Sequence, residues 1–245
     1  MKCLVAAITL ISVAAFSPSK AASSGLTQLS SSKDDLIGFA EKCNPVVKFF
    51  DPSNLTNGNF WNRGEDATIG WLRQSEIKHS RVAMAAFVGY CVQSNYVFPG
   101  AFHMDGTGAP GPEFSPEQQW DMIPEAAKWQ IFGFIALLEI WDEMGGNDGA
   151  LPHYTKGRKP GQYPPFNKYI DLYDPFGFSK TRTDEAKERG LVVEVNNGRL
   201  AMLGIFGFLA ADKVDGAVPI LSGYGIPMPY AGNVMIPFEG NFELY

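Results

Sequence analysis

Two groups of ionisable and amide side chains recur in the sequence with the same internal spacing. They are Glu76, His79 and Arg81 in the first group and Glu194, Asn197 and Arg199 in the second. On a helix a residue three positions after the glutamate shares its face, whereas the arginine five positions on is turned roughly 140° away. Each glutamate therefore pairs poorly with the arginine of its own group. Two such helices crossing about a twofold axis can instead exchange partners, Glu76 with Arg199 and Glu194 with Arg81.

This exchange has a chemical consequence for the two carboxylates. Single buried charges are prohibitive, while paired and hydrogen-bonded ones are tolerable. A carboxylate has two oxygens, so one can bind arginine while the other remains free as a ligand. His79 and Asn197 add a ring nitrogen and an amide oxygen. We expect these four side chains to suit a hard ion held mostly by another group, such as magnesium in a tetrapyrrole, which needs one axial ligand.

The two groups lie inside a longer internal repeat, which sets the elements that must position them. Residues 76–90 and 194–208 are identical at five of fifteen positions. Each copy follows an aromatic-Asp-Pro sequence, with Asp51 before the first copy and Asp174 before the second. A repeat of this kind suggests a pseudo-twofold pair of helices. Small residues in both copies would let the two backbones approach closely.

We expect three main helices, near 68–97, 124–144 and 184–213, separated by long loops rich in glycine and proline. The apolar stretches within them are about eleven, ten and twelve residues long, shorter than the ~20 that span a bilayer. By hydropathy alone they favour the buried helices of a soluble bundle. A membrane interpretation therefore depends on neutralising the charges at the edges of these stretches.

The remaining sequence limits the partners and the compartment. A formal charge of −6 without a run of Lys or Arg argues against nucleic acid as the main partner. Residues 1–33 combine a short apolar signal-like run with a serine-rich segment that contains lysines but no acid. This is typical of a bipartite plastid-targeting presequence, a signal peptide followed by a transit peptide. Residues 34–245 would then form the functional domain.

The repeated motifs, E-x-x-H-S-R-x-A-M and E-x-N-N-G-R-L-A-M, resemble the first and third membrane helices of the chlorophyll-binding light-harvesting antenna family. The long loops and the presequence are more similar to its chlorophyll a/c branch, the fucoxanthin or peridinin antennae, than to green-plant members. The resemblance implies an all-α membrane protein with three transmembrane helices, the first and third crossed about a pseudo-twofold axis. It implies no enzymatic activity.

The resemblance also implies roles for particular residues. Glu76, His79, Glu194 and Asn197 would be axial ligands of chlorophyll magnesium, with Arg81 and Arg199 as structural partners of the two glutamates. Gln130 and Glu139 of the middle helix resemble two further chlorophyll ligands, although here they are nine positions apart against eight in green-plant members. The carotenoid grooves of the family would be flanked here by four further residues: Met84, Met202, Asp51 and Asp174.

The cofactors implied are chlorophyll a, chlorophyll c and a xanthophyll of the fucoxanthin, peridinin or diadinoxanthin type. The chain would be a multi-pass protein of the plastid thylakoid membrane, and its partners would be a photosystem core, neighbouring antenna subunits and thylakoid lipids. It would pass excitation energy to the photosystem.

Three alternatives remain open at this point. A photoprotective quencher could use the same scaffold, and a pigment-poor membrane protein could pack against a photosystem. A di-iron carboxylate bundle has Glu-x-x-His on a helix, but it needs a second such motif, and this chain has Glu-x-x-Asn. His103 and His153 lie in polar loops, where we expect them to be solvated.

Overall fold

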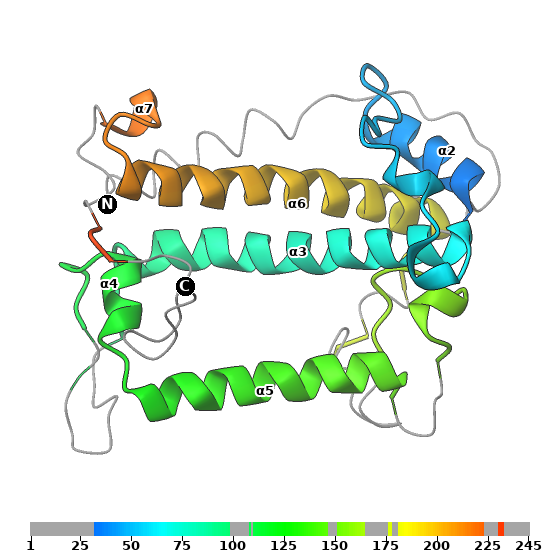
Figure 1. Cartoon of the computed structure of the whole chain (residues 1–245). Helices are drawn as coiled ribbons and strands as arrows, with labels where there is room; N and C mark the ends of the chain where they lie inside the picture. Colours follow the sequence, from blue (N-terminus) through cyan, green and yellow to red (C-terminus); the bar gives the residue numbers. More distant parts are fainter. Residues whose placement is uncertain are drawn as a thin grey trace. The chain divides into compact units, whose positions relative to one another are not determined.

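A computed structural model describes most of the chain as helices joined by loops (Figure 1). The described residues are 32–98, 108, 110–146, 151–164, 176–177, 181–222 and 230–232. Among them the α-helices are α2 (Lys33–Cys43), α3 (Glu65–Gln93), α4 (Pro116–Asp121), α5 (Glu125–Met144), α6 (Asp184–Lys213) and α7 (Pro219–Ser222). Short 3-10 turns are η1 (Leu55–Asn57), η2 (Phe60–Asn62) and η4 (Tyr154–Lys156). These described ranges contain helices and no strand.

The three long helices correspond to the three expected from the sequence, with small differences at their ends. Helix α3 begins earlier than expected, with Glu65 and Asp66 in the first turn, where acidic side chains favour the helix N-terminus. It ends at Gln93 rather than near residue 97. There the Ser94 hydroxyl donates to the Tyr90 carbonyl (2.7 Å) and the Asn95 amide donates to the Cys91 carbonyl (2.7 Å). These bonds satisfy carbonyls at the helix end and stop the helix.

Helix α4 was not expected from the glycine and proline content of this region. Its start is fixed by a capping box in which Ser115 and Gln118 each bond the other's backbone. Pro116 occupies the first turn, where its missing N–H costs nothing. Helix α5 ends, as expected, before two glycines. Gly145 and Gly146 both have positive φ, at 75° and 83°, a conformation that terminates helices.

The chain divides into two compact units, and α3, α5 and α6 each contribute one part to both. Among the described residues, unit 1 comprises those within Ala83–Gly133 and Ala201–Tyr245, and unit 2 comprises those within Ser23–Val82 and Phe134–Leu200.

In unit 2 the first part of α3 packs against the first part of α6. Ile77 and Val195, which hold the same position in the two repeat copies, are both buried. Gly198 lies so close to Ser80 that a Cβ at Gly198 would overlap the Ser80 side chain. Helix α2 adds to this packing, because the Asn196 amide donates to the Cys43 carbonyl (3.0 Å). Unit 2 is therefore built around the repeated motif.

In unit 1 the later parts of α3 and α6 pack through aromatic rings. The Tyr90 and Phe208 rings stack at 4.8 Å, and Phe87 stacks on Phe208 at 5.1 Å. A Cβ at Gly204 would come within 2.8 Å of the Phe87 ring. The Tyr90 hydroxyl donates to Asp212 Oδ2 (2.7 Å). Since the contacts advance along both helices together, from Phe87 with Gly204 to Tyr90 with Asp212, the two segments run in the same direction.

By length and composition, α6 alone among the described helices is suited to cross a membrane. Much of α5 is nevertheless apolar and exposed in the isolated chain, at Trp129, Ile131, Phe134, Ile135, Leu137 and Ile140. An apolar surface of this kind marks contact with other molecules or with lipid.

Candidate functional site

The structure brings together Arg81 of α3 and Glu194 of α6. Arg81 Nε donates to Glu194 Oε1 at 2.6 Å. A second nitrogen of Arg81, Nη1, donates to the Gly161 carbonyl at 2.8 Å. The two side chains are 23% and 22% exposed. The pair is thus well shielded within unit 2, and it also anchors the loop that contains Gly161.

The reciprocal pair, Arg199 and Glu76, is also formed. Arg199 Nε and Nη2 both bind Glu76 Oε1, at 2.8 and 2.7 Å. Here the side chains are 47% and 26% exposed, so this pair is more open than its counterpart. Both arginines reach across to the glutamate of the other helix, as the spacing of the motif requires.

In both pairs the arginine binds only one oxygen of the glutamate. Within the part of the chain that the structure describes, Oε2 of Glu76 and Oε2 of Glu194 have no hydrogen-bond partner. A neutralised carboxylate with one free oxygen suits a hard cation that needs a single additional ligand. The donor set at these two positions therefore fits the magnesium of a tetrapyrrole.

His79 and Asn197 lie three positions after these glutamates, and both are exposed. His79 Nδ1 lies 2.8 Å from the Ser75 carbonyl oxygen, to which it donates a hydrogen bond. The proton on Nδ1 leaves Nε2 with a lone pair, and a hydrogen bond of this type orients a ligating imidazole. The Asn197 amide has no partner among the described residues. Both side chains are therefore available to a ligand.

Helix α5 carries the other two expected ligands, Gln130 and Glu139. Gln130 is exposed and makes no hydrogen bond within the described ranges. Glu139 is held differently, because its Oε2 accepts from Lys78 Nζ of α3 at 2.6 Å. Glu139 is thus a third carboxylate paired with a cation from another helix, and its Oε1 has no hydrogen-bond partner in the described part of the chain.

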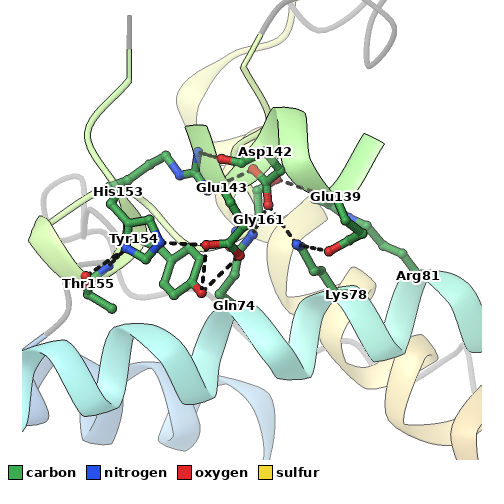
Figure 2. Close-up of polar contacts among 11 residues, drawn as sticks. Gln74, Lys78, Arg81, Glu139, Asp142, Glu143, His153, Tyr154, Thr155 and Gly161 are labelled. Carbon is green, nitrogen blue, oxygen red and sulfur yellow. Dashed lines mark hydrogen bonds and ion pairs between the residues drawn. The ribbon is translucent and has the colours of Figure 1, made fainter. Parts of the chain in front are cut away.

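Lys78 belongs to a buried polar network that the sequence did not reveal (Figure 2). Its Nζ also binds Asp142 Oδ2 at 2.8 Å, and the other oxygen of Asp142 binds Arg158 Nη2 at 2.8 Å. Gln74 donates to Asp142 Oδ2 at 3.1 Å and accepts from the Gly161 N–H at 2.7 Å. Both Asp142 and Arg158 are fully enclosed, with no exposed side-chain surface. The network fastens α3, α5 and the loop through residue 161 together.

The expectation that His153 is solvated is wrong. Its Nε2 lies 2.7 Å from Glu143 Oε2, and its Nδ1 lies 2.7 Å from the Thr155 hydroxyl (Figure 2). The Tyr154 hydroxyl donates to Glu143 Oε1 at 3.0 Å. Burial, followed by the hydrogen bond and the negative charge of Glu143, raises the pKa of Tyr154 to about 12. His103 lies outside the described residues.

The remaining expected residues have simpler surroundings. The Asp51 carboxylate accepts from the backbone of Leu55 and Thr56 (3.0 and 2.9 Å) and from the Thr56 hydroxyl (2.7 Å), so it orders its own loop. These bonds to Thr56 lower the pKa of Asp51. Met84 and Met202 occupy equivalent repeat positions, and each is half-buried. Asp174 lies outside the described residues.

Two helices that neutralise each other's charges and leave a carboxylate oxygen for a further ligand would suit a helical protein that binds a metal-containing pigment. The chain belongs to the chlorophyll A-B binding protein family, whose model matches residues 35–213. This family consists of all-α membrane proteins that harvest light and are not enzymes. The expected antenna family is thereby confirmed, and the di-iron enzyme alternative is set aside.

Individual relatives agree with the family match. The chain is 30% identical, over 90% of its length, to a chloroplastic fucoxanthin-chlorophyll a-c binding protein of Trieres chinensis, of which it covers 98%. It is 30% identical, over 87% of its length, to the chloroplastic fucoxanthin-chlorophyll a-c binding protein F of Phaeodactylum tricornutum, of which it covers 96%. The chlorophyll a/c branch expected from the sequence is the branch that these names describe.

Proposed function

We propose that this chain is an antenna subunit that binds chlorophyll a, chlorophyll c and a xanthophyll of the fucoxanthin type, and that it transfers excitation energy to a photosystem. The observation that carries the proposal is the pair of reciprocal Glu–Arg contacts, each of which leaves one carboxylate oxygen free. A bound chlorophyll would supply the light absorption. The protein would supply axial ligands, fixed spacing and a dry environment.

Six side chains are our proposed axial ligands: Glu76, His79, Glu194, Asn197, Gln130 and Glu139. The four in the repeat are supported by equivalent positions in the two copies and by a free oxygen or nitrogen on each side chain. Gln130 is supported by its exposed, unpaired amide, and Glu139 by its pairing with Lys78. Met84 and Met202, together with Asp51 and Asp174, would flank two carotenoid grooves.

A pseudo-twofold axis relating α3 and α6 is supported in each unit taken by itself. In unit 2, Ser80 and Gly198 occupy equivalent repeat positions and lie against each other. In unit 1, Tyr90 and Phe208 are equivalent and their rings stack. Contact between equivalent residues is the relationship that an axis running between the two helices produces.

We further propose that α3, α5 and α6 all span the membrane. They contain 29, 20 and 30 residues, which at ~1.5 Å per residue is enough for a hydrocarbon core about 30 Å thick. Five of the charged side chains of α3 and α5 are paired with each other, with α6 or with Arg158: Glu76, Lys78, Arg81, Glu139 and Asp142. Paired charges lower the cost of burial, and intramembrane charges usually belong to functional sites.

The membrane would be the thylakoid, reached through a bipartite presequence within residues 1–33. The relatives are named as chloroplastic, which supports a plastid location. Ser32 caps α2 by accepting from the Asp35 N–H at 3.4 Å, and this argues that processing ends before Ser32. Neighbouring antenna subunits, a photosystem core and thylakoid lipids would cover the exposed apolar surface.

Pigment extraction from the purified protein tests this proposal. We expect chlorophyll a, chlorophyll c and a carbonyl carotenoid to co-purify with the chain. The matched comparison is the double variant Arg81→Leu/Arg199→Leu, which should retain much less pigment. A purified, folded wild-type chain that carries no chlorophyll would overturn the proposed function.

A further inference from the structure

Lys78 of α3, in the first repeat copy, binds two carboxylates of α5. Its Nζ lies 2.6 Å from Glu139 Oε2 and 2.8 Å from Asp142 Oδ2 (Figure 2). The lysine side chain is only 17% exposed. The equivalent position in the second copy is Asn196, whose amide binds the Cys43 carbonyl instead. The internal repeat therefore does not explain the contacts that Lys78 makes.

We infer that Lys78 is a positioning residue for a pigment on α5: it neutralises and orients Glu139 so that the remaining oxygen, Oε1, can act as an axial ligand for chlorophyll magnesium. This rests on the proposed function and extends it to a residue outside the two Glu–Arg pairs. A glutamate of α5 would then be neutralised by a cation of another helix, as the glutamates of α3 and α6 are, but by a lysine instead of an arginine.

The position of Lys78 is fixed by Asp142 and by the residues that hold Asp142 in place. Asp142 holds Nζ through Oδ2 and is itself held by Arg158 through Oδ1 and by the Gln74 amide. Arg158 also donates to the Asp142 carbonyl at 3.1 Å. Because Asp142 and Arg158 are fully enclosed, the ammonium group has little freedom to follow Glu139. Glu139 must instead orient itself towards Lys78.

The charges of the network also balance. Lys78 and Arg158 supply two positive charges, while Glu139 and Asp142 supply two negative charges. A neutral group of four can lie at the edge of a low-dielectric region without a further counter-ion. Glu139 can therefore offer its free oxygen to a metal that already has its charge balanced by a macrocycle.

Asp142 and Glu139 differ in the partners that each would keep without Lys78. This difference distinguishes a positioning role of Lys78 from a purely structural one. Without Lys78, Asp142 would still have Arg158 at 2.8 Å and Gln74 at 3.1 Å, so the enclosed carboxylate would keep its main support. Glu139 has no other partner among the described residues, and its side chain is 51% exposed. Removing the ammonium group should therefore affect Glu139 much more than the fold.

The test compares Lys78→Met with Glu139→Leu in the full chain assembled with its pigments. We expect Lys78→Met to weaken retention of one chlorophyll about 10- to 100-fold, the usual effect of removing a group that orients a metal ligand. Glu139→Leu should weaken retention of the same chlorophyll at least as much, because it removes the ligand itself, and the two absorption difference spectra should have the same shape. The double variant should lose no more pigment than Glu139→Leu, because both changes act on one site.

Two further variants keep the result interpretable. Lys78→Arg keeps a cation at this position, so this variant should retain most of the chlorophyll absorption band that Lys78→Met loses. Lys187→Met removes an exposed lysine on α6 whose one ion pair among the described residues is with Asp184, at 3.6 Å, and it should change nothing. Thermal unfolding followed by circular dichroism reports the fold independently of pigment, and Lys78→Met should unfold close to the wild-type temperature.

The inference is overturned if Lys78→Met keeps the band that Glu139→Leu removes, or if it loses all pigments together with a large drop in unfolding temperature. Either result would leave Lys78 as a purely structural residue while the wild type still binds chlorophyll. A wild-type chain without chlorophyll would instead refute the proposed function itself.

Discussion

Ser80 of α3 and Gly198 of α6 occupy the same position of the repeated motif, and their backbones approach so closely that no side chain fits on Gly198. Ser80 is almost completely buried by this contact. On its own helix, each of these two residues follows the glutamate by four positions and directly precedes the arginine. The close approach is therefore next to both Glu–Arg pairs. It brings the helices near enough for each arginine to reach the other helix.

Gly198→Ala should therefore force the helices apart. We expect a loss of about 1–3 kcal/mol, typical of overpacking, together with weaker pigment binding at both glutamates. Gly190→Ala is the matched control on the same helix, because a Cβ there meets nothing within 4 Å. The control should be neutral or up to about 1 kcal/mol more stable, since alanine favours the helix. Equal unfolding temperatures for the two variants would contradict the close approach.

The two arginines should differ in their importance. Arg81→Leu strands Glu194 in the better shielded pair and removes the bond to Gly161, so we expect a loss of about 3 kcal/mol. Arg199→Leu should cost less, about 1 kcal/mol, because its side chain is 47% exposed. Both variants should lose pigment and stability together, as measured by extraction and thermal unfolding. Unchanged pigment content in both would count against the reciprocal pairs.

The two described histidines should give opposite results. His79→Leu removes a free ring nitrogen on the helix surface, so we expect selective loss of chlorophyll with little change in unfolding temperature. His153→Leu removes contacts to Glu143 and Thr155, so we expect lower stability without selective pigment loss. Pigment analysis by chromatography distinguishes the two. If His79→Leu retained full pigment, this residue would not be a ligand.

Alkaline pH should weaken the fold through Tyr154. The pKa of its phenol is raised from 10.0 to about 12, so the folded chain keeps the proton while the unfolded chain loses it. This contribution is complete below pH 10 and is lost as the pH rises towards 12. Ultraviolet absorption of phenolate measures the titration, with Tyr154→Phe identifying the signal. A Tyr154 that ionises at its ordinary pKa would contradict its burial beside Glu143.

The reciprocal pairs could be expected from the sequence because helical periodicity separates residues five apart, and buried charges need partners. The same reasoning predicted three long helices. The capping box that starts α4 was also readable, in Ser115 and Gln118, but the surrounding glycines and prolines obscured it. These features depend on short-range spacing.

The network around Asp142 could not be predicted in the same way. Arg158 reaches Asp142 from a loop without a repeating pattern, and the path of such a loop depends on the whole fold. Lys78 could be recognised as unusual only because the second copy has Asn196 in its place. The surroundings of His153 could not be predicted either, because its polar neighbours in the sequence do not indicate that it contacts Glu143.

The most direct test of the account is the fluorescence excitation spectrum of the purified protein, recorded at chlorophyll a emission. We predict that light absorbed by chlorophyll c and by the carotenoid excites this emission, and that disrupting the Glu–Arg pairs abolishes the transfer. Chlorophyll a emission without any contribution from the other pigments, or a folded protein with no pigment at all, would contradict it.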